Sequence, residues 1–299
     1  MPYLAPMIQH PDAKLKRQVC ACLSQIAKHS IDLAEVVVEA EVCPKIFVCL
    51  KDPDLIVRRN AATCIREIAR HTPELAHLIV NAGGHGAIIE YISQIRGGAR
   101  LPGIMTLGYI AAFSETLALA IVVAQGIPPL KDALVSEEDD NEKSAAAWSL
   151  GQIGKHSPDH AKMLAQANVF PLLIDIFRNE NHSPDLHQKV QKTLKMVLQK
   201  CTHLPALEPL LEDCPDKILK YVVHQFAKVL PNNPAARKSF VQSRGLAKIQ
   251  ELKSDDKSKF QEYIATINSC YPREIVEYYS PNYSDTLLKK LEDYEGPRS

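Results

Sequence analysis

Apolar residues recur along this chain with the spacing of helices, and the pattern itself returns at a fixed interval. Four similar segments, QIAKHS, EIARHT, YIAAFS and QIGKHS, begin at Gln25, Glu67, Tyr109 and Gln152. The steps between them are 42, 42 and 43 residues, and weaker copies follow around Val197, Phe226 and Ile267. Such a period is typical of an α-solenoid, in which a single repeat is too small to bury its own apolar face.

Capping residues and turns divide each repeat into three predicted helices. The first helix is expected to begin at a Ser or Thr cap and to end at a glycine turn. The caps are Ser30, Thr72 and Ser157, and the turns lie near Gly83, Gly126 and Gly245. A second, shorter helix is expected over residues 46–50, 87–95, 129–135 and 172–177.

The third and longest helix of each repeat carries apolar residues spaced by four and three, which places them on one face. These residues are Val19, Leu23 and Ile26; Ala61, Ile65 and Ile68; Ala146, Leu150 and Ile153; Val190, Leu194 and Val197. We expect this face to form the core of the stack.

Composition agrees with an all-α protein and removes several function classes. Of 299 residues, 46% are hydrophobic but only 6% are aromatic, and 12 are glycine. These aromatic and glycine contents are low for a β-rich chain. The net charge is zero, so the basic footprint of a nucleic-acid or anionic-membrane binder is absent. The longest apolar stretch, residues 117–124, is far shorter than the roughly 20 residues of a membrane span. The first residues lack the charged and apolar regions of a secretory signal peptide, so the sequence predicts a cytoplasmic protein.

No motif predicts catalysis, a cofactor or a metal site. The eight cysteines form no CxxC pair. Cys20 and Cys22 occupy the repeat positions of Ala62 and Cys64, so we expect both to fill the core. HExxH, GxSxG, Walker-type and GxGxxG sequences are absent.

Two further groups of polar residues have structural interpretations. His29, His71 and His156 share one position at the end of the long helix, where an imidazole can cap carbonyls. The acidic run Glu137–Asp140, with Glu142, is expected to be a solvated loop before a helix.

The segment AAAWSLGQIGKHSP, at residues 145–158, resembles the third helix of armadillo repeats. The resemblance covers roughly residues 1–272, strongly as far as Phe177, and implies a right-handed superhelix of three-helix repeats. The stretches HPDAKLKRQVCACLSQIAKHS and YSPNYSDTLLKKLEDY are similar to armadillo proteins of the central-pair apparatus of motile cilia and flagella.

That similarity implies a non-catalytic scaffold of the axonemal cytoskeleton that supports motility. Its implied partners are central-apparatus proteins and tubulin or microtubules, bound directly or indirectly. The alternative is a soluble armadillo adaptor in signalling, adhesion or transport. A nuclear-import carrier is the weaker form of that alternative, because the Trp and Asn ladder that import carriers use to hold basic peptides is essentially missing here.

The predicted domain organisation is an array over residues 1–272 and a tyrosine-rich capping segment over 273–299. The first repeat is incomplete, because Pro2, Pro11 and Asp12 align with the second helix and turn of the next repeat. We therefore expect a shortened form or a fragment, with self-association through residues 1–29. A short irregular repeat near 202–230 has room for a first helix over 204–211 and no second helix.

The anchor of each repeat is the apolar residue Ile26, Ile68, Ile110, Ile153, Val197, Phe226 or Ile267. The predicted partner site lies on the long helices, one, five and eight residues before each anchor. The armadillo resemblance implies that these positions line the groove of the stack. Its residues are Met105, Tyr109, Trp148, Gln152, Met196 and Tyr221. Tyr and Trp are common at interface hot spots, although partial burial between neighbouring helices would explain them equally well.

Basic residues recur at the start of the long helices and could meet acidic partner segments such as tubulin tails. This basic edge consists of Lys16, Arg17, Arg58, Arg59, Arg100 and Lys143. The sequence therefore predicts a partner segment with apolar anchors over Tyr109 and Trp148 and an acidic end toward Arg58 and Arg100.

Overall fold

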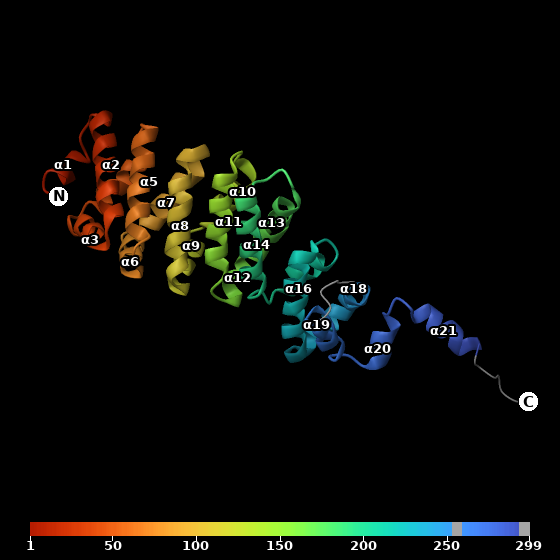
Figure 1. Ribbon diagram of the computed structural model, residues 1–299. Coiled ribbons are helices and arrows are strands. Elements are labelled where there is room, and N and C mark those ends of the chain that lie inside the picture. Colours follow the sequence, from red (N-terminus) through yellow and green to blue (C-terminus); the bar gives the residue numbers. More distant parts are fainter. Residues whose placement is uncertain (253–258, 293–299) are drawn as a thin grey trace, which may run out of the picture. The chain divides into compact units, whose positions relative to one another are not determined.

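The computed structural model describes residues 1–252 and 259–292, and every regular element in those ranges is a helix (Figure 1). The chain forms two compact units, one spanning Met1–Lys200 and one beginning at Cys201. The predicted all-α class is therefore confirmed. In the described part no single helix has the length and hydropathy to cross a membrane. The helices α9 (Glu115–Val123) and α10 (Ile127–Ser136) have the required length and hydropathy only when taken together, and this pair is bent by 78°.

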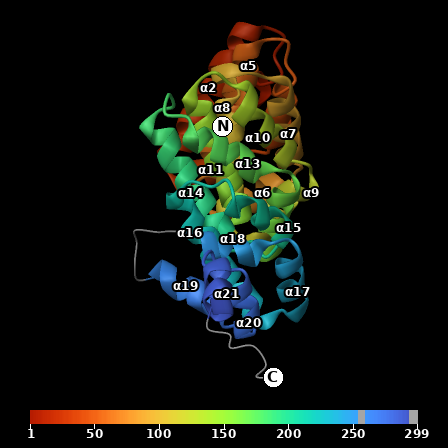
Figure 2. The same ribbon diagram turned by 90° about the vertical axis from the view of Figure 1, so that its right-hand side faces the viewer.

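The first unit is built on a row of long helices, each the third helix of a predicted repeat. They lie side by side in chain order in Figure 1, and in Figure 2 α7, α9 and α10 lie to their right. The long helices are α2 (Ala13–His29), α5 (Leu55–Ala69), α8 (Leu101–Phe113), α11 (Asp140–Gly154) and α14 (Pro184–Leu198).

Two shorter helices connect each long helix to the next, after the single turn α1 (Leu4–Met7) at the start. The first of each pair is α3 (Ile31–Glu39), α6 (Pro73–Asn81), α9 or α12 (Pro158–Gln166). The second is α4 (Cys43–Cys49), α7 (Gly84–Gln94), α10 or α13 (Val169–Arg178). All four predicted second helices are present, but each begins two or three residues earlier than expected.

A left-handed residue explains the early starts. Backbone φ is 53° at Glu41, 79° at Gly83, 63° at Gln125 and 55° at Asn168, so the same conformation recurs in every turn between a first and a second helix. One such residue redirects the chain, and the next helix begins within two residues of it.

The first helices end near Gly126 and Gly245 as predicted, at Val123 and Gln242, but neither glycine supplies the positive φ of its turn. Gly126 has φ −75°, and a Cβ there would lie 2.5 Å from Cγ2 of Ile121. Gly245 follows the left-handed Arg244, and a Cβ on it would clash with the ring of Phe240. Both positions need a missing side chain for close packing, not a glycine backbone.

The predicted core face of the long helices is confirmed except at Ile26, which is half-buried. Cys20 is buried, but the prediction for Cys22 is wrong: it is exposed, because two residues along a helix turn the side chain by roughly 200°. Val19 and Leu23 are buried as well, so any self-association through residues 1–29 must use other side chains.

Neighbouring long helices approach closely where small residues face each other. The Ser149 hydroxyl on α11 donates to the carbonyl of Ile104 on α8 at 2.9 Å. The Thr193 hydroxyl on α14 donates to the carbonyl of Ala147 on α11, also at 2.9 Å. These hydroxyls bond backbone across repeats, which requires short distances between helix axes.

The repeated histidines bind the neighbouring repeat. Nε2 of His71 lies 2.6 Å from the carbonyl oxygen of Ala27, at the end of α2, and Nε2 of His156 lies 2.6 Å from that of Ala111, in the last turn of α8. The imidazole N–H is the donor in each case, because a carbonyl only accepts. The carbonyl-capping prediction is therefore confirmed at these two positions, across the repeat boundary, while His29 is exposed.

The second unit begins with the short helix predicted over 204–211, present as α15 (Leu204–Leu207) and the 3₁₀ turn η2 (Glu208–Leu211). The remaining α-helices are α16 (Asp216–Val229), α17 (Pro234–Gln242), α18 (Gly245–Glu251), α19 (Lys259–Asn268), α20 (Arg273–Tyr278) and α21 (Tyr283–Glu292). No residue of α20 or α21 is buried, and residues 293–299 lie outside the described ranges. The capping role of 273–299 stays a prediction.

Candidate partner-binding site

A pocket of about 490 Å³ opens across the row of long helices in the first unit. One wall is a stripe on α8 made by Leu101, Met105 and Tyr109, which are four residues apart and so share a face. The facing wall, on α11, includes Ala145 and Trp148. The other lining residues are Arg59 on α5, Gly98, Asp139, Asn141, Glu142, Ser144, and Asp185 and Lys189 on α14. We call this site the α8–α11 pocket.

An aromatic pair forms the apolar part of the pocket. The rings of Tyr109 and Trp148 meet edge to face, with centroids 5.1 Å apart and planes at 69°. Both side chains and Met105 are half-buried, so each keeps a surface that a ligand can contact. Three of the six predicted groove residues are thus brought together.

The other three predicted groove residues do not line the pocket. Gln152 is buried, and its Oε1 accepts a hydrogen bond from Nζ of Lys155 at 2.6 Å. Met196 is half-buried on α14. Tyr221 lies on α16, in the second unit.

Polar groups without partners lie in the pocket wall. Glu142 is only 2% exposed, and its Oε2 has no hydrogen-bond partner; the Oγ of buried Ser144 has none either. Burial, followed by the nearby carboxylates of Asp139 and Glu137, raises the pKa of Glu142. The predicted solvated acidic loop is therefore wrong at Glu137 and Glu142, both of which are buried.

Arg100 is fully buried and cannot form part of an exposed basic edge. Its guanidinium donates to Oε1 of Glu137 at 3.0 Å, to Oδ2 of Asp132 at 2.9 Å and to the carbonyl of Pro129 at 2.8 Å. The other oxygen of Glu137 accepts from the backbone N–H of Gly97 at 2.8 Å. The prediction that Arg100 meets an acidic partner segment is wrong, because the chain's own acids surround it.

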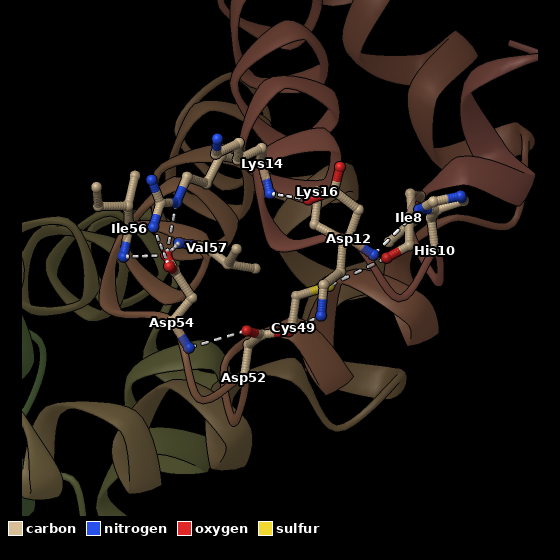
Figure 3. Close-up of polar contacts among 11 residues, drawn as sticks. Ile8, His10, Asp12, Lys14, Lys16, Cys49, Asp52, Asp54, Ile56 and Val57 are labelled. Carbon is tan, nitrogen blue, oxygen red and sulfur yellow. Dashed lines mark hydrogen bonds and ion pairs between the residues drawn. The ribbon is translucent and has the colours of Figure 1, made fainter.

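Lys16 and Arg17 also form ion pairs within the chain. Lys16 pairs with Asp52, and both residues are labelled in Figure 3. Arg17 pairs with Asp54 through two contacts, the Nε–Oδ1 distance being 3.0 Å. Arg17 and the backbone N–H groups at the start of α5 hold the pKa of Asp54 at about 2, well below its usual range. These cations tie the first two long helices together, so a partner would have to compete with the chain's own carboxylates.

The remaining residues of the predicted basic edge differ in position. Arg59 is exposed and lines the α8–α11 pocket. Arg58 and Lys143 are half-buried and do not line it. The structure therefore assembles no continuous basic surface from the six residues.

Comparison with known proteins identifies the fold. The HEAT repeat family matches residues 42–72, which contain α4 and α5. Crystallised computationally designed armadillo repeat proteins for modular peptide recognition match 74% of this chain and 96% of theirs, with TM-score 0.63 and 18% identity. The chain folds as an armadillo solenoid. A designed armadillo repeat protein in complex with the peptide (KR)4 gives TM-score 0.61 at 14% identity, over 91% of this chain and 99% of that one.

Closer relatives of this solenoid are found by sequence. Sperm-associated antigen 6 of Homo sapiens is 56% identical over 168 residues, which cover 56% of this chain and 33% of the relative. The mouse protein of the same name is 57% identical over the same length. The predicted resemblance to this armadillo protein is confirmed, and the matched stretch spans about a third of the relatives' length.

Proposed function

We propose that this solenoid is a non-catalytic structural scaffold of the axonemal central-pair apparatus in motile cilia and sperm flagella. In this proposal it lies in the cytoskeleton of the axoneme, binds central-apparatus or microtubule-associated partners, and supports motility. The resemblance to sperm-associated antigen 6 supports the setting. The observation that carries the binding role is the α8–α11 pocket, whose aromatic pair is half-buried instead of packed away.

The pocket suits an extended or helical segment of a protein partner. Trp and Tyr bury a large area with few rotatable bonds, so they often dominate binding energy at interfaces. The (KR)4 complex and the modular peptide recognition named for the designed neighbours concern those proteins, and they support peptide binding as a use of this fold. We place the partner's apolar residues over Tyr109 and Trp148. The proposal does not include an acidic partner segment at Arg100, because Arg100 is buried.

Replacing Tyr109 and Trp148 together with Ala should weaken binding to isolated axonemes at least tenfold, or about 1.4 kcal/mol. The measurement is cosedimentation of the purified full chain with axonemes at raised salt, where weak ionic contacts are screened. Helicity from circular dichroism should be unchanged.

The matched control replaces Leu119 and Val123 with Ala. These two exposed apolar residues of α9 line a different pocket, so binding to axonemes should persist. Retained binding by the Tyr109 and Trp148 variant, together with a lower melting temperature, would show that the aromatic pair is core. Absence of binding by the wild-type chain would favour the alternative, a soluble adaptor in signalling, adhesion or transport.

A further inference from the structure

We infer that Cys20 and Cys49 form an intrachain disulfide when the protein meets a hydroperoxide such as hydrogen peroxide, and that this bond ties α2 to the end of α4. The proposed scaffold role does not include this modification, and the inference does not depend on that role. Both thiols belong to the first unit, and neither lines the α8–α11 pocket.

The register of the helices brings the two thiols together. Lys16 on α2 pairs with Asp52, which follows the end of α4 and whose N–H donates to the carbonyl of Cys49 at 3.2 Å. Cys20 lies four residues after Lys16, and Cys49 lies three residues before Asp52, so each thiol is about one helical turn from this ion pair. The side chains of Cys20 and Cys49 are in hydrogen-bond contact, as this register requires.

The two thiols differ in their exposure. Cys20 is fully buried, whereas Cys49 is 5% exposed and its Sγ donates a weak hydrogen bond to the carbonyl oxygen of Ile8, beside α1, at 3.8 Å (Figure 3). So narrow an opening favours a small oxidant such as hydrogen peroxide over a bulky one such as glutathione disulfide. We therefore expect the oxidant to reach Cys49 before Cys20.

The surroundings of the pair give the two thiols different reactivities. The hydrogen bond from the Cys20 thiol, together with the nearby ammonium group of Lys16, lowers the pKa of Cys49 although burial opposes this change. The same hydrogen bond and burial raise the pKa of Cys20. Because the thiolate is the nucleophile, Cys49 is the sulfur that a peroxide oxidises first, and Cys20 is the resolving thiol beside it.

The oxidation takes place in two steps. The Cys49 thiolate attacks one oxygen of hydrogen peroxide, the O–O bond breaks, and the leaving hydroxide takes up a proton to give water and the sulfenic acid of Cys49. The sulfur of Cys20 then attacks the sulfenic sulfur, the S–O bond breaks, and the thiol proton leaves with the hydroxyl group as a second water. Two thiols are oxidised to one disulfide and one peroxide is reduced to two waters.

Peptide mapping of the oxidised full chain tests the pairing. After treatment with hydrogen peroxide, the remaining thiols are blocked with iodoacetamide and the chain is digested with trypsin. We expect the peptide of residues 18–28 to be linked to that of residues 46–51, with fragment ions between Cys20 and Cys22 placing the bond at Cys20. This product should be at least tenfold more abundant than any other disulfide of Cys49, and dithiothreitol should remove it.

Two alanine variants form a matched pair. Cys20→Ala removes the buried thiol at a position where the next repeat has Ala62, and Cys22→Ala removes an exposed thiol two residues later. Cys20→Ala should lower the yield of the linked peptides at least tenfold, whereas Cys22→Ala should retain it. Circular dichroism of the reduced variants checks that both are folded.

The bond should also change stability. Oxidised wild type and oxidised Cys22→Ala should unfold at a higher urea concentration than their reduced forms, because the bond closes the loop of residues 20–49 in the unfolded chain. Cys20→Ala should show no such rise. Dithiothreitol should return the unfolding midpoint of the oxidised wild type to that of the reduced protein.

The inference is overturned if Cys49 pairs instead with Cys43 or Cys64, if Cys20→Ala retains the linked product or Cys22→Ala loses it, or if peroxide oxidises Cys22 while Cys20 and Cys49 stay reduced. It is also overturned if the bond forms without raising the urea midpoint. None of these measurements uses axonemes, so failure here would leave the scaffold role standing. Disulfide formation in a chain that does not bind axonemes would reject the scaffold role alone.

Discussion

Arg100→Ala should lower the free energy of unfolding of the first unit by about 3–5 kcal/mol, the effect expected when one partner of a buried ion pair is removed. The fully buried guanidinium is bound by two carboxylates and a carbonyl. Without it, Glu137 would remain buried with a single backbone N–H as its donor. Urea unfolding followed by Trp148 fluorescence measures the change close to the site, since α10 packs on α11.

Arg96→Ala is the matched control for this experiment. Arg96 pairs with the same oxygen of Asp132, at 3.1 Å, but its side chain is 52% exposed. Exposed pairs contribute about 0–1 kcal/mol, so this variant should unfold almost like the wild type. Equal losses for Arg96 and Arg100 would mean that burial is not what makes the Arg100 cluster important.

Gly108→Ala should destabilise the first unit by about 2 kcal/mol, because overpacking costs more than the helix propensity gained from Ala. A Cβ at Gly108 would lie 2.5 Å from the Ser149 hydroxyl and 2.7 Å from Cε3 of Trp148, with Cζ3 nearer still. Relief requires α8 and α11 to separate or the indole to move. Thermal unfolding followed by circular dichroism is the appropriate readout, since the variant also changes the surroundings of the only tryptophan.

Gly86→Ala tests the steric explanation with the same chemical change. A Cβ at Gly86, in α7, meets nothing within 4 Å, so the gain in helix propensity should leave stability equal or slightly higher. If both alanine variants lose stability equally, close approach of α8 and α11 is not the cause.

Much of the fold was predictable because every repeat of a solenoid packs its helices against its neighbours in the same way. Each long helix buries the same face against its neighbours, so the positions of Ala61, Ile65 and Ile68 recur in every repeat and identify the core. The turns were harder to predict from the sequence. Glu41 and Gln125 adopt the left-handed conformation that is most common for glycine, so their residue types do not mark the turn.

The aromatic part of the site followed from helix geometry, which places Met105 and Tyr109 on one face, together with the armadillo resemblance, which implies that this face is the groove. Its charged part did not, since the partners of a charge in a solenoid lie one repeat away. A usable signal was present: Lys16, Arg17 and Arg100 each have an acid 36 or 37 residues later, at Asp52, Asp54 and Glu137. The same offset from Arg59 reaches Ile95 and Arg96, and Arg59 is the exposed cation at the pocket.

The most direct test of the scaffold role is the location of the tagged chain in a motile ciliated cell after detergent extraction. The account predicts that the chain remains with the axoneme along the length of the cilium and that the Tyr109 and Trp148 double variant is extracted. A wild-type chain that washes out with the soluble proteins, or accumulates in the nucleus, would contradict it.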